Sequence, residues 1–92
     1  EDGLNATTDD ILIFPNPVID LLNISLSNNN KSEIIDIEIY NLKGELILSE
    51  IKRSNKLGTT LISLNVQDLP NATYILKIIS NSKSLSRKFV KK

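Results

Sequence analysis

EIIDIEIYNLKGELILSEI, residues 33–51, is the stretch that decides the fold. Its first part alternates strictly between apolar and polar side chains, placing Ile35, Ile37 and Ile39 on one face and Asp36, Glu38 and Tyr40 on the other. A period of two residues is typical of a β-strand with one buried and one hydrated side. Residues 33–40 are therefore expected to form a strand at a sheet surface.

A turn follows this strand. Asn41, Leu42, Lys43 and Gly44 separate the first strand from a second apolar run at 45–51. Glycine adopts a positive φ without steric cost, so Gly44 suits the left-handed position of such a turn. The two runs predict an antiparallel hairpin.

The same alternation extends in both directions from the hairpin. Strands are expected at 11–14, 21–27, 59–66, 74–79 and 84–90, with loops at 28–32 and 52–58 and turns at 67–73 and 81–82. The inward side chains are expected to be Leu22, Leu26, Leu64, Leu76, Ile24, Ile62, Ile78, Val66 and Tyr74. Pro15 and Pro17 lack backbone donors, so 11–14 should be an edge strand or the approach to a turn.

The predicted fold is all-β. Fourteen Leu and fourteen Ile against two Ala favour pleated strands over helices. About seven strands joined by short turns predict a small antiparallel β-sandwich of immunoglobulin-like type. A closed barrel is the alternative.

Ninety-two residues correspond to one domain. Residues 1–10 are polar and acidic, with no periodicity, and are interpreted as a linker that precedes a domain at 11–92. No apolar run is long enough to span a bilayer. The absence of an initiator Met suggests a piece of a longer chain.

The composition argues against several kinds of chemistry. The chain has no His and no Cys, which excludes the common catalytic triads and zinc sites. Asp9, Asp10 and Asp20 lack the pattern of a calcium-binding loop, and neither glycine-rich phosphate motif is present. Zero net charge and few aromatic residues argue against nucleic acid. We expect no enzyme activity, no metal and no cofactor.

The charges are segregated along the chain. Residues 1–20 carry only acidic charges, and residues 69–92 carry only basic ones. The final strand is itself basic and places Leu85, Arg87 and Phe89 on one face. A basic edge of this kind either keeps the domain soluble or docks on an acidic partner.

Four stretches in order carry a resemblance: FPNPV at 14–18, IYNLKGELI at 39–47, LNVQDLPNATYILKI at 64–78 and RKFVKK at 87–92. Together they resemble the C-terminal sorting domain of type IX secretion substrates, also called the Por secretion system domain. The resemblance covers residues 11–92.

The resemblance implies a role in protein export. Such domains sit at the C-terminus of cargo proteins in Gram-negative bacteria and direct them from the periplasm across the outer membrane to the cell surface or the medium. It implies outer-membrane type IX secretion components as partners, an upstream cargo domain, and a sortase-like peptidase that cuts the linker. It also implies a β-sandwich fold.

The family pattern maps onto particular residues of this chain. The matches expected to have a structural role are Phe14, Pro15, Asn16, Pro17, Gly44, Leu69, Pro70 and Tyr74. The matches expected to form the terminal recognition motif are Lys88, Phe89, Val90, Lys91 and Lys92. Tyr74 is expected to bury its ring and leave its hydroxyl at the rim. Ala72 stands where the family usually has Gly, which puts the local turn geometry in doubt.

Two other functions remain open from the sequence. A cell-surface adhesive or carbohydrate-binding module could use a similar sandwich, although sugar sites usually present aromatic platforms. A structural spacer between domains is the other.

Overall fold

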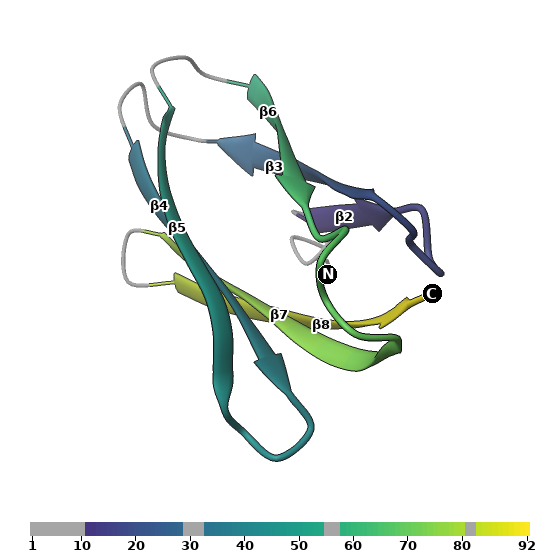
Figure 1. The fold of residues 1–92 in the computed structure, drawn as a ribbon. Helices are drawn as coiled ribbons and strands as arrows, with labels where there is room; N and C mark the ends of the chain where they lie inside the picture. Colours follow the sequence, from purple (N-terminus) through teal and green to yellow (C-terminus); the bar gives the residue numbers. More distant parts are fainter. Residues whose placement is uncertain (1–10, 29–32, 55–57, 81–82) are drawn as a thin grey trace, which may run out of the picture.

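The computed structural model describes residues 11–28, 33–54, 58–80 and 83–92. Every described element is a strand, and Figure 1 labels them in chain order. The strands are β2 (Ile11–Phe14), β3 (Leu21–Asn28), β4 (Glu33–Asn41), β5 (Leu46–Ser54), β6 (Gly58–Asn65), β7 (Ala72–Ser80) and β8 (Lys83–Lys91). The predicted all-β class is confirmed.

The strands form two sheets. One has the order β2-β3-β6 and the other the order β5-β4-β7-β8, and all the pairings within them are antiparallel. Figure 1 shows the sheets as two layers whose strands cross. The fold is therefore the predicted sandwich rather than a closed barrel.

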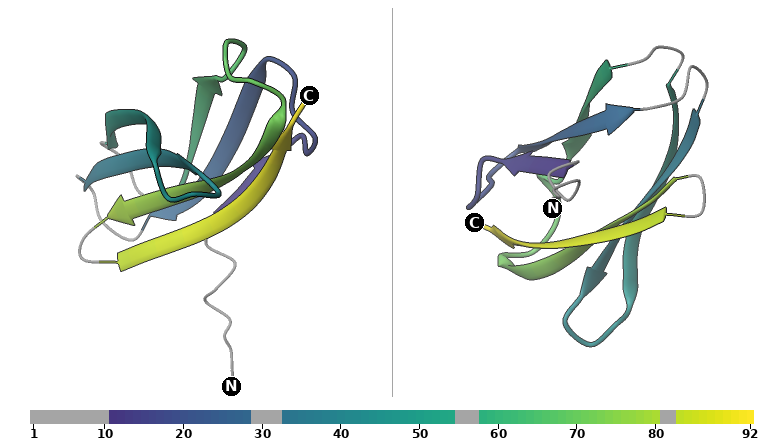
Figure 2. Two further views of the ribbon diagram at one scale, coloured as in Figure 1. Left: turned by 60° about the horizontal axis from the view of Figure 1, so that its bottom comes forward. Right: turned by 180° about the vertical axis from the view of Figure 1, so that it is seen from behind.

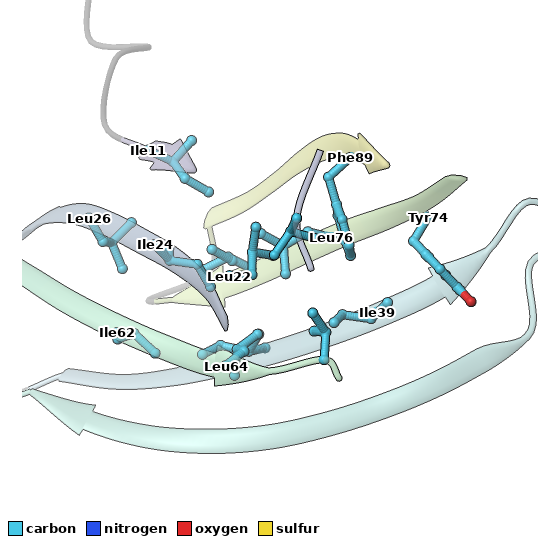
Figure 3. Packing of buried hydrophobic residues seen from close by; sticks show 14 of the residues in the cluster. Ile11, Leu22, Ile24, Leu26, Ile39, Ile62, Leu64, Tyr74, Leu76 and Phe89 are labelled. Atoms are coloured by element: carbon cyan, nitrogen blue, oxygen red, sulfur yellow. The ribbon is translucent and has the colours of Figure 1, made fainter. Parts of the chain in front are cut away.

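The predicted alternation sets the core. Ile35, Ile37 and Ile39 are fully buried, and the inward positions expected on the other strands are buried as well. Figure 3 shows the labelled side chains of both sheets meeting between the layers. Packing of this apolar set between two sheets is the main source of stability in such a fold.

Several predicted boundaries were wrong by a few residues. Residues 52–54, expected in a loop, extend β5, where Arg53 pairs with Ile34. Ala72 and Thr73, expected in a turn, begin β7. Strand pairing overrode local composition at these positions, because an adjacent strand supplies hydrogen bonds to any extended backbone. The predicted linker at 1–10, the turn at 81–82 and most of the loop at 28–32 lie outside the described residues.

Candidate functional site

Strand β8 is held in the sandwich up to its last residues. Its residues pair with β7 from Lys83 opposite Ser80 to Lys91 opposite Ala72. Phe89 is fully buried and Lys91 is 5% exposed, whereas Leu85 and Arg87 are half-buried on the same inner face. An end tied into the core in this way differs from the loose termini of most domains.

The FPNPV segment lies along the open edge of β8. The Val18 amide donates to the Val90 carbonyl at 2.8 Å, and the Lys92 amide donates to the Val18 carbonyl at 2.8 Å. Between them, Asn16 Oδ1 accepts a hydrogen bond from the Val90 amide at 2.9 Å. Val18 and Lys91 form an isolated parallel bridge. These bonds join the connection after β2 to the C-terminal end of the opposite sheet.

The side chains of this segment differ in burial. Val18 is fully buried, whereas Phe14 is 41% exposed and both prolines are exposed. The Phe14–Pro15 and Asn16–Pro17 peptide bonds are cis. The prediction that the prolines follow an edge strand is confirmed, because β2 lies at the edge of its sheet.

Tyr74 links the late turn to the terminal strand. Its hydroxyl donates to the Pro70 carbonyl at 2.7 Å, and its ring stacks on Phe89 with centroids 5.7 Å apart. The predicted burial of the ring is confirmed, and the hydroxyl is held by the carbonyl of the late turn. Leu69 packs on the core, and its amide donates to the Val66 carbonyl. The turn and the terminal strand are thus fixed to each other.

Asn41 organises the hairpin between β4 and β5. Its Oδ1 accepts hydrogen bonds from the amides of Lys43 and Glu45, and its Nδ2 donates to Glu45 Oε1 at 2.6 Å. The Gly44 amide donates to the Asn41 carbonyl, and Gly44 has the predicted positive φ, 89°. The turn is therefore fixed by side-chain bonds as well as by glycine.

Ala72 resolves the doubt raised by the sequence. It is a strand residue, paired with Lys91, and extended backbone is open to any residue. No glycine is needed at this position.

The four stretches converge at one end of the sandwich. Tyr74 pairs with Asn41 on one side and with Phe89 on the other, and Lys91 lies between Ala72 and Val18. In both views of Figure 2 the C-terminus lies beside the connection between β2 and β3. We call this region the motif end and define it as residues 14–18, 41–45, 69–74 and 87–92.

The basic groups of the motif end differ in exposure. Lys91 Nζ donates to the Lys92 carbonyl at 3.1 Å and is part-buried, whereas Lys88 and Lys92 are exposed. Burial of the Lys91 stem adds apolar contact, while its ammonium is held by the Lys92 carbonyl. Lys88 and Lys92 are therefore the exposed lysines of the terminal motif.

Sequence reasoning missed the central role of three residues here. Val18, Asn41 and Glu45 make the bonds that join or shape the motifs, yet they were not among the candidate site residues. An Asx turn at Asn41 is a detectable local signal. The pairing of Val18 with Lys91 has no local signal because it depends on the fold.

We also searched the described residues for features of a metal site, a membrane-spanning helix and a sugar-binding platform. Within them, no group of three or more metal-ligating side chains gathers, and no helix has the length and apolarity to cross a membrane. Tyr74 and Phe89 are buried, which removes both rings from any sugar-binding platform. Tyr40 and Phe14, both partly exposed, belong to different sheets.

Comparison with known families decides the assignment. The family model described as the secretion system C-terminal sorting domain matches residues 12–92. The chain belongs to this family. The sorting domain is thus a type IX secretion signal, and its family role implies export of an attached protein to the cell surface or the extracellular space.

A solved structure supports the fold of the sorting domain. The crystal structure of dimeric latent PorU from Porphyromonas gingivalis matches 89% of this chain with a TM-score of 0.77 at 20% identity. The sorting domain corresponds to 9% of that chain's length. No curated protein matches the sequence.

Proposed function

We propose that the export machinery of the outer membrane recognises this sorting domain at its terminal motif, Lys88 to Lys92. The observation that supports this most is the ordering of β8 up to Lys91 by bonds from Asn16 and Val18. A fixed strand end presents Lys88 and Lys92 at defined positions, so a receptor need not pay the entropy of ordering them.

The sorting domain then acts on cargo attached upstream. The cargo passes through the periplasm, and the sorting domain directs it across the outer membrane through the type IX components. Residues 1–10, polar and acidic, serve as the linker that a sortase-like peptidase cuts afterwards. A signal of this kind is bound rather than catalytic, which agrees with a chain that has no His and no Cys.

Removal of the last two residues tests recognition at the terminal motif. We would fuse the chain, and separately residues 1–90, behind a signal peptide and a fluorescent reporter in a host with type IX secretion. Deleting Lys91 and Lys92 removes the Lys92–Val18 hydrogen bond, the pairing of Lys91 with Ala72 and the buried Lys91 side chain, but leaves both bonds to Val90. We expect the reporter on 1–90 to stay in the periplasm while 1–92 is exported.

Two controls complete this experiment. Chemical unfolding of purified 1–90 must show a folded domain, and a Leu61→Thr variant of the intact chain, changed far from the motif end, must still be exported. Export of folded 1–90 at the level of 1–92 would contradict recognition at the terminal motif. The mass of the exported protein, with and without the host peptidase, reports whether cleavage falls within residues 1–10.

A further inference from the structure

The motif end carries an apolar row on its outer side. Pro17 lies between two residues that both bond to Val90, so it flanks Val90 at the edge of the sheet. Val90 pairs with Thr73 on β7. Thr73 in turn lines a hollow of about 250 Å³ together with Ala72 and the hairpin residues Asn41, Leu42 and Lys43. The row therefore runs from Pro17 through Val90 and Thr73 to Leu42.

Three exposed lysines surround this row. Lys43 lines the hollow, Lys88 precedes Val90 by two residues on the same strand, and Lys92 follows it by two. Glu45 on the hairpin accepts a hydrogen bond from the neutral Asn41 amide and keeps its negative charge, but no acidic residue occurs in 69–92, so the motif end as a whole is predominantly basic. We call Pro17, Leu42, Thr73 and Val90, with Lys43, Lys88 and Lys92, the motif-end patch.

The size of the hollow limits its occupant. Small-molecule sites usually enclose about 300–1,000 Å³. The hollow is smaller than this range, and Leu42 beside it is 63% exposed. It has room for one apolar side chain of a partner, which would pack against Leu42.

We propose that the motif-end patch is a docking surface for a polypeptide of the export machinery that inserts one apolar side chain beside Leu42 and presents carboxylates to the three lysines. This inference rests on the proposed function and extends the recognition site beyond the terminal motif to the hairpin at 41–45. Cationic groups around an apolar centre complement a partner with the opposite charge at its rim. A lipid headgroup would also attract lysines, and the ring of Phe14 at the motif end is 41% exposed, so the crosslinking experiment below includes an adduct with lipid as an outcome.

A double variant of the hairpin separates this inference from recognition of the terminal motif. Leu42→Thr with Lys43→Gln alters the patch and leaves residues 88–92 unchanged. The matched control is Leu61→Thr with Lys52→Gln, because Leu61 is 64% exposed and Lys52 is a surface cation on β5. We expect about tenfold less exported reporter for the hairpin variant and no loss for the control, since an exposed Leu and a rim charge together contribute about that factor in affinity.

The outcomes are distinguishable. If the folded hairpin variant is exported like the intact chain while Lys88→Gln with Lys92→Gln is not, the patch inference is overturned and the terminal motif stands. If the intact chain is not exported, the proposed function fails and the patch with it.

A photo-crosslinking amino acid at position 42, with position 61 as control, identifies the occupant during export. We expect an adduct at position 42 whose mapped peptide contains Asp or Glu beside an apolar residue. An adduct with lipid or lipopolysaccharide would instead assign the patch to the membrane surface and overturn the proposal.

Discussion

The side chain of Asn16 joins the segment after β2 to the terminal strand β8 by one hydrogen bond. Its Oδ1 accepts the Val90 amide across 74 positions of sequence, and the neighbouring Val18 supplies two backbone bonds. Backbone bonds survive most substitutions, so the side-chain bond is the part of this joint that mutation can remove selectively. Asn16 thus positions the terminal strand without being part of the terminal motif.

Replacing Asn16 tests this positioning role. We expect Asn16→Ala to lower the free energy of unfolding by about 1 kcal/mol, the usual net value of one hydrogen bond. The Val90 amide should exchange with solvent much faster, and export should fall. Asn16→Asp retains an acceptor oxygen and should restore slow exchange. Unchanged exchange of the Val90 amide in Asn16→Ala would contradict the role.

Tyr40 provides a prediction about pH. Its hydroxyl donates to Glu38 Oε1 at 2.6 Å, and this hydrogen bond, with smaller contributions from desolvation and the carboxylate charge, raises the pKa of Tyr40 above the ordinary 10.0. A raised pKa means that the stabilisation is fully present below pH 10 and is lost as pH rises through the folded-state value. A spectroscopic tyrosinate titration should show Tyr40 ionising at lower pH in Glu38→Ala. An unchanged midpoint would show that the hydrogen bond does not form in solution.

Among the described residues, Ser80 is the one whose side chain has a buried polar atom with no hydrogen-bond partner. Its hydroxyl oxygen is buried without a hydrogen-bond partner, on the inner face of β7. Removing an unpaired buried hydroxyl relieves its desolvation penalty, so Ser80→Ala should raise the free energy of unfolding by about 1 kcal/mol. Urea unfolding measures this, and a less stable variant would indicate that the hydroxyl has a partner in solution.

At the scale of the element, the hairpin turn at 41–45 is stabilised in two ways, by side-chain hydrogen bonds and by a glycine with a positive φ. Asn41 bonds hold the backbone, and Gly44 takes the left-handed conformation at φ 89°. A Cβ at Gly44 would meet no atom within 4 Å, so a substitution there costs only backbone strain.

Two substitutions of Gly44 test whether backbone strain at its positive φ determines the loss of stability. Gly44→Ala should cost about 1 kcal/mol of stability, and Gly44→Asn less, because Asn adopts the left-handed region more readily. Thermal unfolding of both variants measures the difference. Equal losses would mean that the positive φ is not what the turn requires.

Sequence reasoning succeeded for the elements where burial on one face imposes a period of two. Ile35, Ile37 and Ile39 were placed correctly for this reason, as were Leu22, Ile24 and Leu26 on β3. It failed at strand ends such as Lys52–Ser54, because the pairing partner rather than composition decides where a strand stops. Alternation also carries no information about which strands become neighbours, so the contact between Val18 and Lys91 could not be predicted.

At the scale of the whole molecule, the sandwich brings motifs from both ends of the chain to one place. The three-stranded sheet contributes the FPNPV segment through the connection after β2, and the four-stranded sheet contributes the hairpin, the late turn and β8. Family membership assigns the domain to secretion, and we propose that a receptor binds the end at which these motifs converge. The motif end therefore connects the fold to its proposed recognition.

The most direct test of that claim is the distribution of a reporter fused ahead of the intact chain in a type IX host and in an isogenic strain without the machine. We expect reporter outside the cells or on their surface in the first strain and in the periplasm in the second. Folded reporter that remains in the periplasm of both strains, or that leaves both equally, would contradict it.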